Sequence, residues 1–485
     1  MQLVPLPSDP NGQAVCDAVT ALEDDTACVA AGCRYTPRIP THPVPSEEDS
    51  LPDLIKLFTF SSEFAATNQN VLRDHPRPTR PDPPSQNRPN KALIVMLLYG
   101  GADSWNMLVP HSGCASRDLY AEYAHIRGAV ALPLAEVLPI QLHEAAPPQP
   151  CTTYAVHGAM PTVKQLWDVG QASWFANIGT LEKPLTRQQF IRGDRPSGLF
   201  GHAAQRKEAQ KVQADNKMAA GVLGRIVDAL VSQDNPYRSK VYSMYGMQKL
   251  VEGDVMPTIV GRRGAARFHQ YDRYASPLQE MTGSQSDSIF ADTYAGILER
   301  SLSTTQRLSE ALQAVDLQGT YSGDTALEQV ARVMGLDPSH HESERDVFMV
   351  GVSNFDTHNS GTPGGLLSKI DADLAALRTD LVAMGKWNST TVVSISDFGR
   401  TITSNGLGTD HGWGGNNFIL VPPSTSVSLT QRSRSLPPRV AWYATKCLLC
   451  PLYSCMILHR VARLKVAIFM VSFPRTSTQP PLISG

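Results

Sequence analysis

The fold of this chain is decided by three consecutive stretches, DVFMVGVSNFDTH at 346–358, LLSKIDADLAALRTDLVAM at 366–384 and VVSISDFGR at 392–400. The first and third stretches begin as apolar runs of strand length, and each reaches an aspartate. The middle stretch has apolar residues at the 3.6-residue period of a helix: Leu366, Leu367, Ile370, Leu374, Leu377, Leu381 and Met384, opposite Asp371, Asp373, Arg378 and Asp380. A strand, a helix and a strand in this order predict a right-handed crossover and therefore a parallel pair.

Further apolar runs extend this unit in both directions. Residues 92–99 form a continuous apolar run before Gly100-Gly101, which is typical of a strand buried on both faces of a parallel sheet. We expect a strand at 173–179 and helices at 161–170, 219–231 and 288–315, and the helices should cover the sheet. The sequence therefore predicts an α/β fold, a three-layer α/β/α sandwich with a mostly parallel central sheet.

Acidic residues and histidines follow the predicted strands. Asp103 follows the first run, Asp356 and His358 follow the second, and Asp397 ends the third. A glycine-rich loop then presents Asp410 and His411. In open α/β sheets ligands bind beyond the carboxyl ends of the strands, so these side chains can meet in one site. Carboxylate oxygens and imidazole nitrogens suit zinc, manganese or iron, and the sequence predicts a metal site.

Structural roles remain open for each of these residues taken singly. Asp103 or Asp397 could cap a helix that follows its strand. Asp356 with His358 could form a turn or a hydrogen-bonded buried pair, and a lone Asp-His-Gly triplet occurs by chance. The occurrence of three such groups, each after an apolar run, favours the metal site.

Four blocks make the resemblance to a known family specific: GGADSWN at 100–106, FDTH at 355–358, DFGRT at 397–401 and GTDHGWGG at 408–415. They resemble the signature blocks of the family called domain of unknown function 1501, which belongs to the alkaline phosphatase and sulfatase superfamily. The stretches VHGAMP at 156–161, NIGTL at 177–181 and LFGHAAQ at 199–205 agree with it. The resemblance covers about residues 91 to 420 and implies an alkaline phosphatase-like domain.

This resemblance also implies an activity and its ligands. We expect metal-dependent hydrolysis of phosphate or sulfate esters with two divalent ions, of which zinc fits best and manganese, calcium or iron are alternatives. Asp103 and Asp397 would bind one ion, and Asp356, His358 and His411 the other. Asp410 would ligate the ion or orient His411.

The catalytic candidates are less marked. The superfamily nucleophile is a Ser, Thr or Cys at a helix start, which leaves Ser104 and Thr162 as candidates. Arg400 could hold an oxygen of the ester group bidentately or form an ordinary ion pair. His202 lies in the block Gly-His-Ala-Ala-Gln, where the family usually shows Ser-His-x-Asp-Gln. The missing hydroxyl and carboxylate favour an alternative: a secreted metal-binding or scaffold protein that keeps the fold without turnover.

The composition limits the partners. The chain has 485 residues, 42% hydrophobic and 18% charged, and a formal net charge of -2. Such a composition is globular, and the charge gives no reason to expect nucleic acid or an anionic membrane as the main partner. We expect a small-molecule ester as substrate, and the sequence predicts no oligomeric state.

Outside the main domain, three segments stand apart. Residues 1–72 contain Cys16, Cys28 and Cys33 and are expected to form a partly disordered module. Disulfides of an exported protein, free thiols and a metal site remain alternatives for these cysteines. Residues 73–90 are rich in proline and charge and predict an extended linker. We expect an extracellular or secretory location, although the first residues lack the pattern of a signal peptide.

The last segment, 421–485, differs in composition from the rest. All 45 acidic residues lie at or before Asp410, whereas the upstream frequency would place roughly 8 after it. We expect translation of an intron or a shifted frame, with a genuine tail as the alternative. The apolar stretch 457–473 is interrupted by four basic or histidine residues, so we do not expect a membrane anchor.

Overall fold

The computed structural model describes residues 84–421, apart from 143–148, 182–186, 195–197, 214–215, 217, 266–270, 284–288, 338–342 and 360–362. The chain divides into two compact units, one of residues 82–264 and 311–485 and one of residues 1–81 and 265–310. In the second unit the described residues form α10 (Tyr271–Gly283) and most of α11 (Ile289–Gln313). The predicted N-terminal module and most of the acid-free tail lie outside the described residues.

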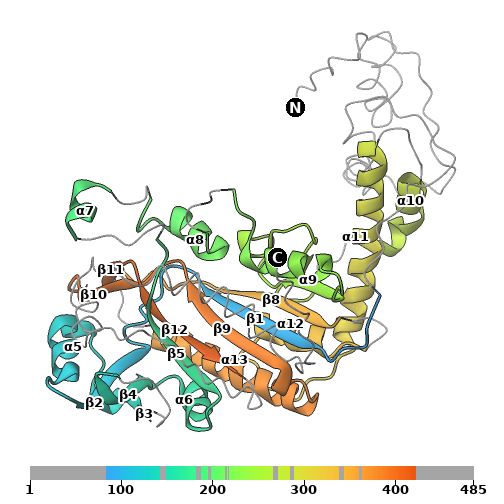
Figure 1. Cartoon of the computed structure of the whole chain (residues 1–485). Helices are drawn as coiled ribbons and strands as arrows, with labels where there is room; N and C mark the ends of the chain where they lie inside the picture. Colours follow the sequence, from blue (N-terminus) through green and yellow to red (C-terminus); the bar gives the residue numbers. More distant parts are fainter. Residues whose placement is uncertain are drawn as a thin grey trace, which may run out of the picture. The chain divides into compact units, whose positions relative to one another are not determined.

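A seven-stranded sheet forms the centre of the first unit (Figure 1). Its order is β5 (Ala172–Ile178), β12 (Gly415–Leu420), β9 (Thr390–Ser396), β1 (Lys91–Leu98), β8 (Arg345–Val352), β6 (Ser239–Ser243) and β7 (Thr258–Ile259). Strands β9, β1, β8, β6 and β7 are parallel, and β12 is antiparallel to both of its neighbours. The prediction of a mostly parallel sheet is confirmed, including the parallel strands on either side of the 366–384 helix.

Helices cover both faces of this sheet (Figure 1). One face carries α8 (His202–Lys211) and α9 (Val222–Ser232), and the other carries α6 (Pro161–Asp168), α12 (Ala326–Met334) and α13 (Gly364–Ala383). On the α9 face Leu93, Val95 and Leu97 of β1 pack with Leu223 and Val227 in one apolar cluster. Because strand residues alternate between faces, the neighbouring residues of the continuous apolar run are buried on the other side. This explains why β1 has no polar position between 92 and 98.

Three aspartates on the polar side of α13 are buried. Asp371, Asp373 and Asp380 are each less than a tenth exposed. Asp371 accepts from the backbone N–H of Thr162 at 2.9 Å, Asp373 from that of Ser322 at 2.8 Å, and Asp380 from that of Gly319 at 2.8 Å. These carboxylates fasten loops and the start of α6 to the helix, because backbone donors left unpaired in the interior would be costly.

A second, three-stranded antiparallel sheet joins β2 (Leu108–Cys114), β4 (Cys151–His157) and β3 (Val137–Gln141). A disulfide between Cys114 and Cys151 links β2 to β4. The remaining elements are α5 (Leu119–Arg127), α7 (Arg187–Arg192), the hairpin strands β10 (Arg400–Ser404) and β11 (Thr409–His411), and the short 3-10 turns η1 (Gly128–Val130), η2 (Leu134–Glu136), η3 (Lys249–Val251) and η4 (Trp387–Ser389). Within the described residues, no helix has the length and apolar content that crossing a bilayer requires.

Residues 84–90, at the end of the predicted extended linker, contact the domain, because Arg88 pairs with Glu344 at 2.9 Å and stacks on Tyr237. One expectation about the site residues needs correction. The Asp410-His411 pair does not lie in an irregular glycine-rich loop. It lies on β11, which pairs antiparallel with β10.

Candidate metal centre

The carboxyl ends of three adjacent parallel strands place the candidate site. Asp397 directly follows β9, and Asp356 follows β8 by four residues. The backbone pairing between β1 and β8 continues past the strands, since the Phe355 N–H donates to Tyr99 O at 3.0 Å. The three strand ends therefore lie at one edge of the sheet, as the sequence predicts.

Two glycines after β1 allow the turns to approach closely. Gly100 has φ +114°, and a Cβ atom there would lie 2.5 Å from the backbone nitrogen of Asp356. Gly101 has φ +77°, and a Cβ atom would lie 2.3 Å from Cε2 of Phe398. Any side chain at either position would clash and would require a left-handed backbone. The GGAD sequence thus serves to bring the turn after β1 against Asp356 and Phe398.

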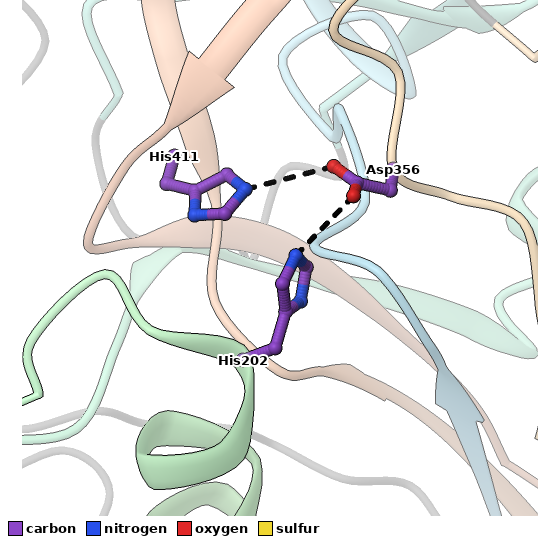
Figure 2. A group of neighbouring side chains, drawn as sticks. All are labelled: His202, Asp356 and His411. Carbon is purple, nitrogen blue, oxygen red and sulfur yellow. Dashed lines mark ion pairs between the residues drawn. The ribbon is translucent and has the colours of Figure 1, made fainter.

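Three side chains from separate elements form a group that can hold a metal ion (Figure 2). His202 is the first residue of α8, Asp356 follows β8, and His411 ends β11. One ligand atom from each lies within 4.8 Å of the others. Figure 2 shows both imidazoles pointing toward the carboxylate, with His202 Nε2 at 3.3 Å and His411 Nε2 at 3.6 Å from its oxygens.

His358 extends this group. Its Nε2 atom lies 3.2 Å from Asp356 Oδ1 and 2.8 Å from His411 Nε2. The predicted set of Asp356, His358 and His411 is therefore brought together. Asp410 contacts His358 rather than His411, because its Oδ1 lies 3.1 Å from His358 Nδ1.

The hydrogen bonds on the far side of each imidazole fix which nitrogen faces Asp356. His202 Nδ1 faces Asp397 Oδ2 at 3.3 Å, and His411 Nδ1 faces Phe200 O at 2.6 Å. His358 Nδ1 faces Asp410 Oδ1. These partners only accept, so they assign the proton of each neutral ring to Nδ1 and leave the Nε2 lone pair free. Metal-binding histidines are oriented by this same arrangement, in which a carboxylate or carbonyl holds the other ring nitrogen.

The donor set therefore fits a divalent cation. Three Nε2 lone pairs gather around a carboxylate, and such electron-rich atoms repel one another unless a cation lies among them. Imidazole and carboxylate ligands with a solvent-accessible side are typical of catalytic zinc sites. The Asp356 side chain is 45% exposed, so an ion held there would keep a position open to solvent.

Arg400 holds the Asp356 carboxylate in place through an ion pair. The Arg400 side chain is fully buried and donates to Gly101 O at 2.8 Å, to Thr409 O at 2.8 Å and to Gly100 O at 2.7 Å, and it forms an ion pair with Asp356. Burial would raise the pKa of Asp356, but the hydrogen bond and the charge of Arg400 hold it below the usual value. Arg400 is thus enclosed by protein groups, and this geometry does not fit the predicted contact of Arg400 with a substrate oxygen.

The surroundings also disfavour protonation of His411. Burial lowers its pKa and the positive charge of Arg400 lowers it further, against the hydrogen bond that His411 Nδ1 donates to Phe200 O. Phe398 packs against His202 and His411, with ring centroids 4.9 Å and 4.5 Å apart. The hydrogen bond from Asn405, followed by that from His358, lowers the pKa of Asp410. These groups are therefore held in the protonation states that bind a metal.

Three of the predicted site residues lie in other contacts. Asp103 forms a buried ion pair with Arg127 of α5. Ser104 is buried, and its Oγ accepts from the Asn416 N–H at 2.7 Å, where it anchors β12. Thr162 begins α6 with its N–H on Asp371. Among the described residues none of these three belongs to the group around Asp356.

Arg206 is a site residue that sequence reasoning missed. It lies four residues after His202 on α8, and its Nε and Nη2 atoms each lie 3.3 Å from the Asp397 carboxylate. Asp397 has a fully buried side chain, and it also accepts from the Gly100 N–H at 3.1 Å. The spacing of four residues could have indicated that His202 and Arg206 share a helix face.

Part of this chain matches a known protein family. Residues 194–420 match the family model described as "Protein of unknown function (DUF1501)". The matched range contains Asp356, Asp397 and His411 but not the block at 100–106. No curated protein matches the chain.

Solved structures with some likeness to this chain include three proteins of low sequence identity. The C-terminal periplasmic domain of EcEptC from Escherichia coli, in complex with Zn, is 10% identical with a TM-score of 0.31, and the match covers 77% of this chain and 91% of that one. An alkaline phosphatase from the Antarctic bacterium TAB5 is 11% identical with a TM-score of 0.27, over 69% and 92% of the two chains. A phosphonate monoester hydrolase of Agrobacterium radiobacter is 11% identical with a TM-score of 0.27, over 70% and 68%. At such TM-scores these likenesses support no conclusion about the activity or the ligands of this chain.

The family match contains three of the four motif blocks, those at 355–358, 397–401 and 408–415. It confirms the resemblance that the motifs indicate. The family that residues 194–420 of this chain match is thus DUF1501, the family that the motif blocks resemble.

Proposed function

We propose that this chain is a metal-dependent hydrolase of phosphate or sulfate esters, with His202, Asp356 and His411 as ligands of a divalent ion. Zinc suits two imidazoles and a carboxylate best among the ions that the sequence leaves open. The observation that carries the proposal is the gathering of Nε2 lone pairs around Asp356, each with its Nδ1 held by an acceptor.

The residues of the chain prepare this site in defined ways. Arg400 keeps Asp356 ionised and fixes its position, and Asp397 and Phe200 orient the imidazoles of His202 and His411. Phe398 gives the site an apolar wall. A divalent ion bound there would supply Lewis acidity, which stabilises charge developing on an ester oxygen.

The attacking group in this proposal is a water molecule. Both residues that the sequence offers as nucleophiles have structural contacts, since Ser104 Oγ accepts from the Asn416 N–H of β12 and the backbone N–H of Thr162, in the first turn of α6, donates to Asp371. The class of ester rests on the resemblance of the motif blocks to the alkaline phosphatase and sulfatase superfamily. A small-molecule ester as substrate also agrees with the nearly neutral charge of the chain.

An oxidising compartment is part of the proposal. The Cys114–Cys151 disulfide lies within the described domain, and disulfides persist mainly in exported proteins. This supports an extracellular or secretory location. Cys16, Cys28 and Cys33, for which a disulfide is one expectation, lie outside the described residues.

The test compares the full chain with an Asp356→Ala and His411→Ala double variant. Metal content of the purified proteins is measured first, and hydrolysis of a panel of phosphate and sulfate monoesters and diesters second. We expect the parent to bind zinc and to hydrolyse at least one ester class, and the double variant to lose both. A matched control replaces Asp316 and His125, which are exposed and lie outside the site, with alanine. A folded parent that binds no metal would contradict the proposal.

A second candidate is a non-catalytic metal-binding or scaffold protein of the same fold. The engagement of Ser104 and Thr162 favours it, as does the absence of the family's Ser and Asp from the His202 block. This candidate predicts full metal binding in the parent with no turnover of any ester in the panel.

A further inference from the structure

Each of the two carboxylates that the family resemblance assigns to a second metal ion pairs with an arginine. The Asp103 and Arg127 side chains pair with exposures of only 2% and 0%. Asp397, whose side chain is fully buried, faces Arg206. The two aspartates lie in separate ion pairs, and within the described residues neither belongs to a group of three or more side chains that could hold a metal. These residues therefore do not fit a second ion.

The hydrogen bonds of Asp397 show how fully it is occupied. Its two oxygens face four donors: the Gly100 N–H at 3.1 Å, His202 Nδ1 at 3.3 Å, and Nε and Nη2 of Arg206 at 3.3 Å each. A carboxylate offers about four lone-pair positions. Oδ2 faces three of these donors and Oδ1 faces one. The buried carboxylate is therefore hydrogen-bonded without an ion, and the guanidinium of Arg206 supplies the positive charge that an ion would have supplied.

Arg206 is also placed to act on a ligand. Its guanidinium lies over the ring of Tyr99 at 4.7 Å, which holds its plane, and its side chain is 37% exposed. Nη1 donates to no described residue, so one edge of the guanidinium remains free. His202, which contacts both Asp356 and Asp397, lies one helical turn before Arg206.

We propose that the centre contains one metal ion and one arginine. In this site Arg206, which forms an ion pair with Asp397, takes the place of a second ion and binds an anionic oxygen of the substrate. This rests on the proposed function, because the metal at His202, Asp356 and His411 would hold the same anionic group from the other side. A guanidinium stays charged at all working pH values and presents paired N–H donors that match the oxygens of phosphate or sulfate.

The experiment uses the full chain, loaded with zinc and desalted, and inorganic phosphate as the probe. Zinc content is measured by elemental analysis, and phosphate binding by isothermal titration calorimetry. The variants are Arg206→Gln, Arg206→Lys and, as a control, Lys207→Gln, which removes an exposed positive charge from the same helix. We expect one zinc per chain in all four proteins. Loss of a charged hydrogen-bond donor should weaken phosphate binding about tenfold to a hundredfold in Arg206→Gln.

Arg206→Lys keeps the charge and should lose less affinity than Arg206→Gln, and Lys207→Gln should match the parent. If Arg206→Gln does not fold, a loss in Arg206→Lys that Lys207→Gln does not share carries the test. Two zinc ions per parent chain, unchanged phosphate affinity in the Arg206 variants, or an equal loss in Lys207→Gln would each overturn the inference. A parent without zinc would instead contradict the proposed function itself.

Discussion

Replacement of Arg400 by methionine should be among the most damaging single changes in the first unit. The fully buried side chain donates to Gly100 O, Gly101 O and Thr409 O, and it pairs with Asp356. Hydrogen bonds to a charged group contribute about 1.5 to 3 kcal/mol each and do not add fully. Breaking a buried ion pair costs about 3 to 5 kcal/mol, but Asp356 is 45% exposed and regains water. We therefore expect a loss of about 3 to 5 kcal/mol in the free energy of unfolding.

Urea denaturation followed by tryptophan fluorescence measures this loss. Trp105 is a suitable reporter, because its Nε1 donates to Arg400 O at 2.6 Å. The matched control is Arg378→Met on the exposed side of α13, which should change stability by less than about 0.5 kcal/mol. An Arg400→Met protein within about 1 kcal/mol of the parent would refute the reasoning that Arg400 joins the three strand ends.

Three further predictions concern stability. Glu344→Gln should destabilise the protein at pH 7 by about 1 to 3 kcal/mol; burial would raise the pKa of Glu344, but hydrogen bonds from Arg88, Gln86 and Arg238 hold it lower. A depressed pKa contributes its full stabilisation only above the unfolded value of about 4.3. The difference in the free energy of unfolding between parent and variant, measured by urea titration, should therefore shrink as pH falls below that value. A constant difference would contradict this. Gly101→Ala should cost about 1 to 3 kcal/mol in the same assay and weaken zinc binding, because its Cβ would displace Phe398 from His202 and His411; unchanged zinc affinity would count against the role of Phe398. Replacing Cys114 and Cys151 by alanine should lower the free energy of unfolding by about 2 to 4 kcal/mol. A reductant should lower the free energy of unfolding of the parent but not that of the variant.

The sequence predicts the central sheet well because its strands are continuous apolar runs. Residues 92–98 and 346–352 carry no polar residue on either face apart from the initial aspartate, which only a sheet covered on both sides explains. The sheet of β2, β3 and β4 was not predicted. Strands β2 and β3 contain Pro110 and Pro139 and bury few side chains, so no clear period marks them.

The site is predictable only as far as strand ends determine it. Asp356 and His358 follow a strand whose end the sequence locates, whereas the block at 408–415 supplies His411, and the structure brings the three together. The partners of Asp103 and Asp397 depend on Arg127 and Arg206, which lie on helices that the periodicity did not reveal. Pairing across such distances in sequence is set by tertiary packing, and no local pattern encodes it.

The most direct test of the metal centre is X-ray absorption spectroscopy at the zinc edge of the zinc-loaded full chain. The account predicts a nearest shell of nitrogen and oxygen ligands at about 2.0 to 2.1 Å, with the outer scattering of at least two imidazoles, and loss of this signal in the Asp356→Ala and His411→Ala double variant. A shell of sulfur at about 2.3 Å would show that cysteines hold the metal instead, and it would contradict the assignment of His202, Asp356 and His411 as its ligands.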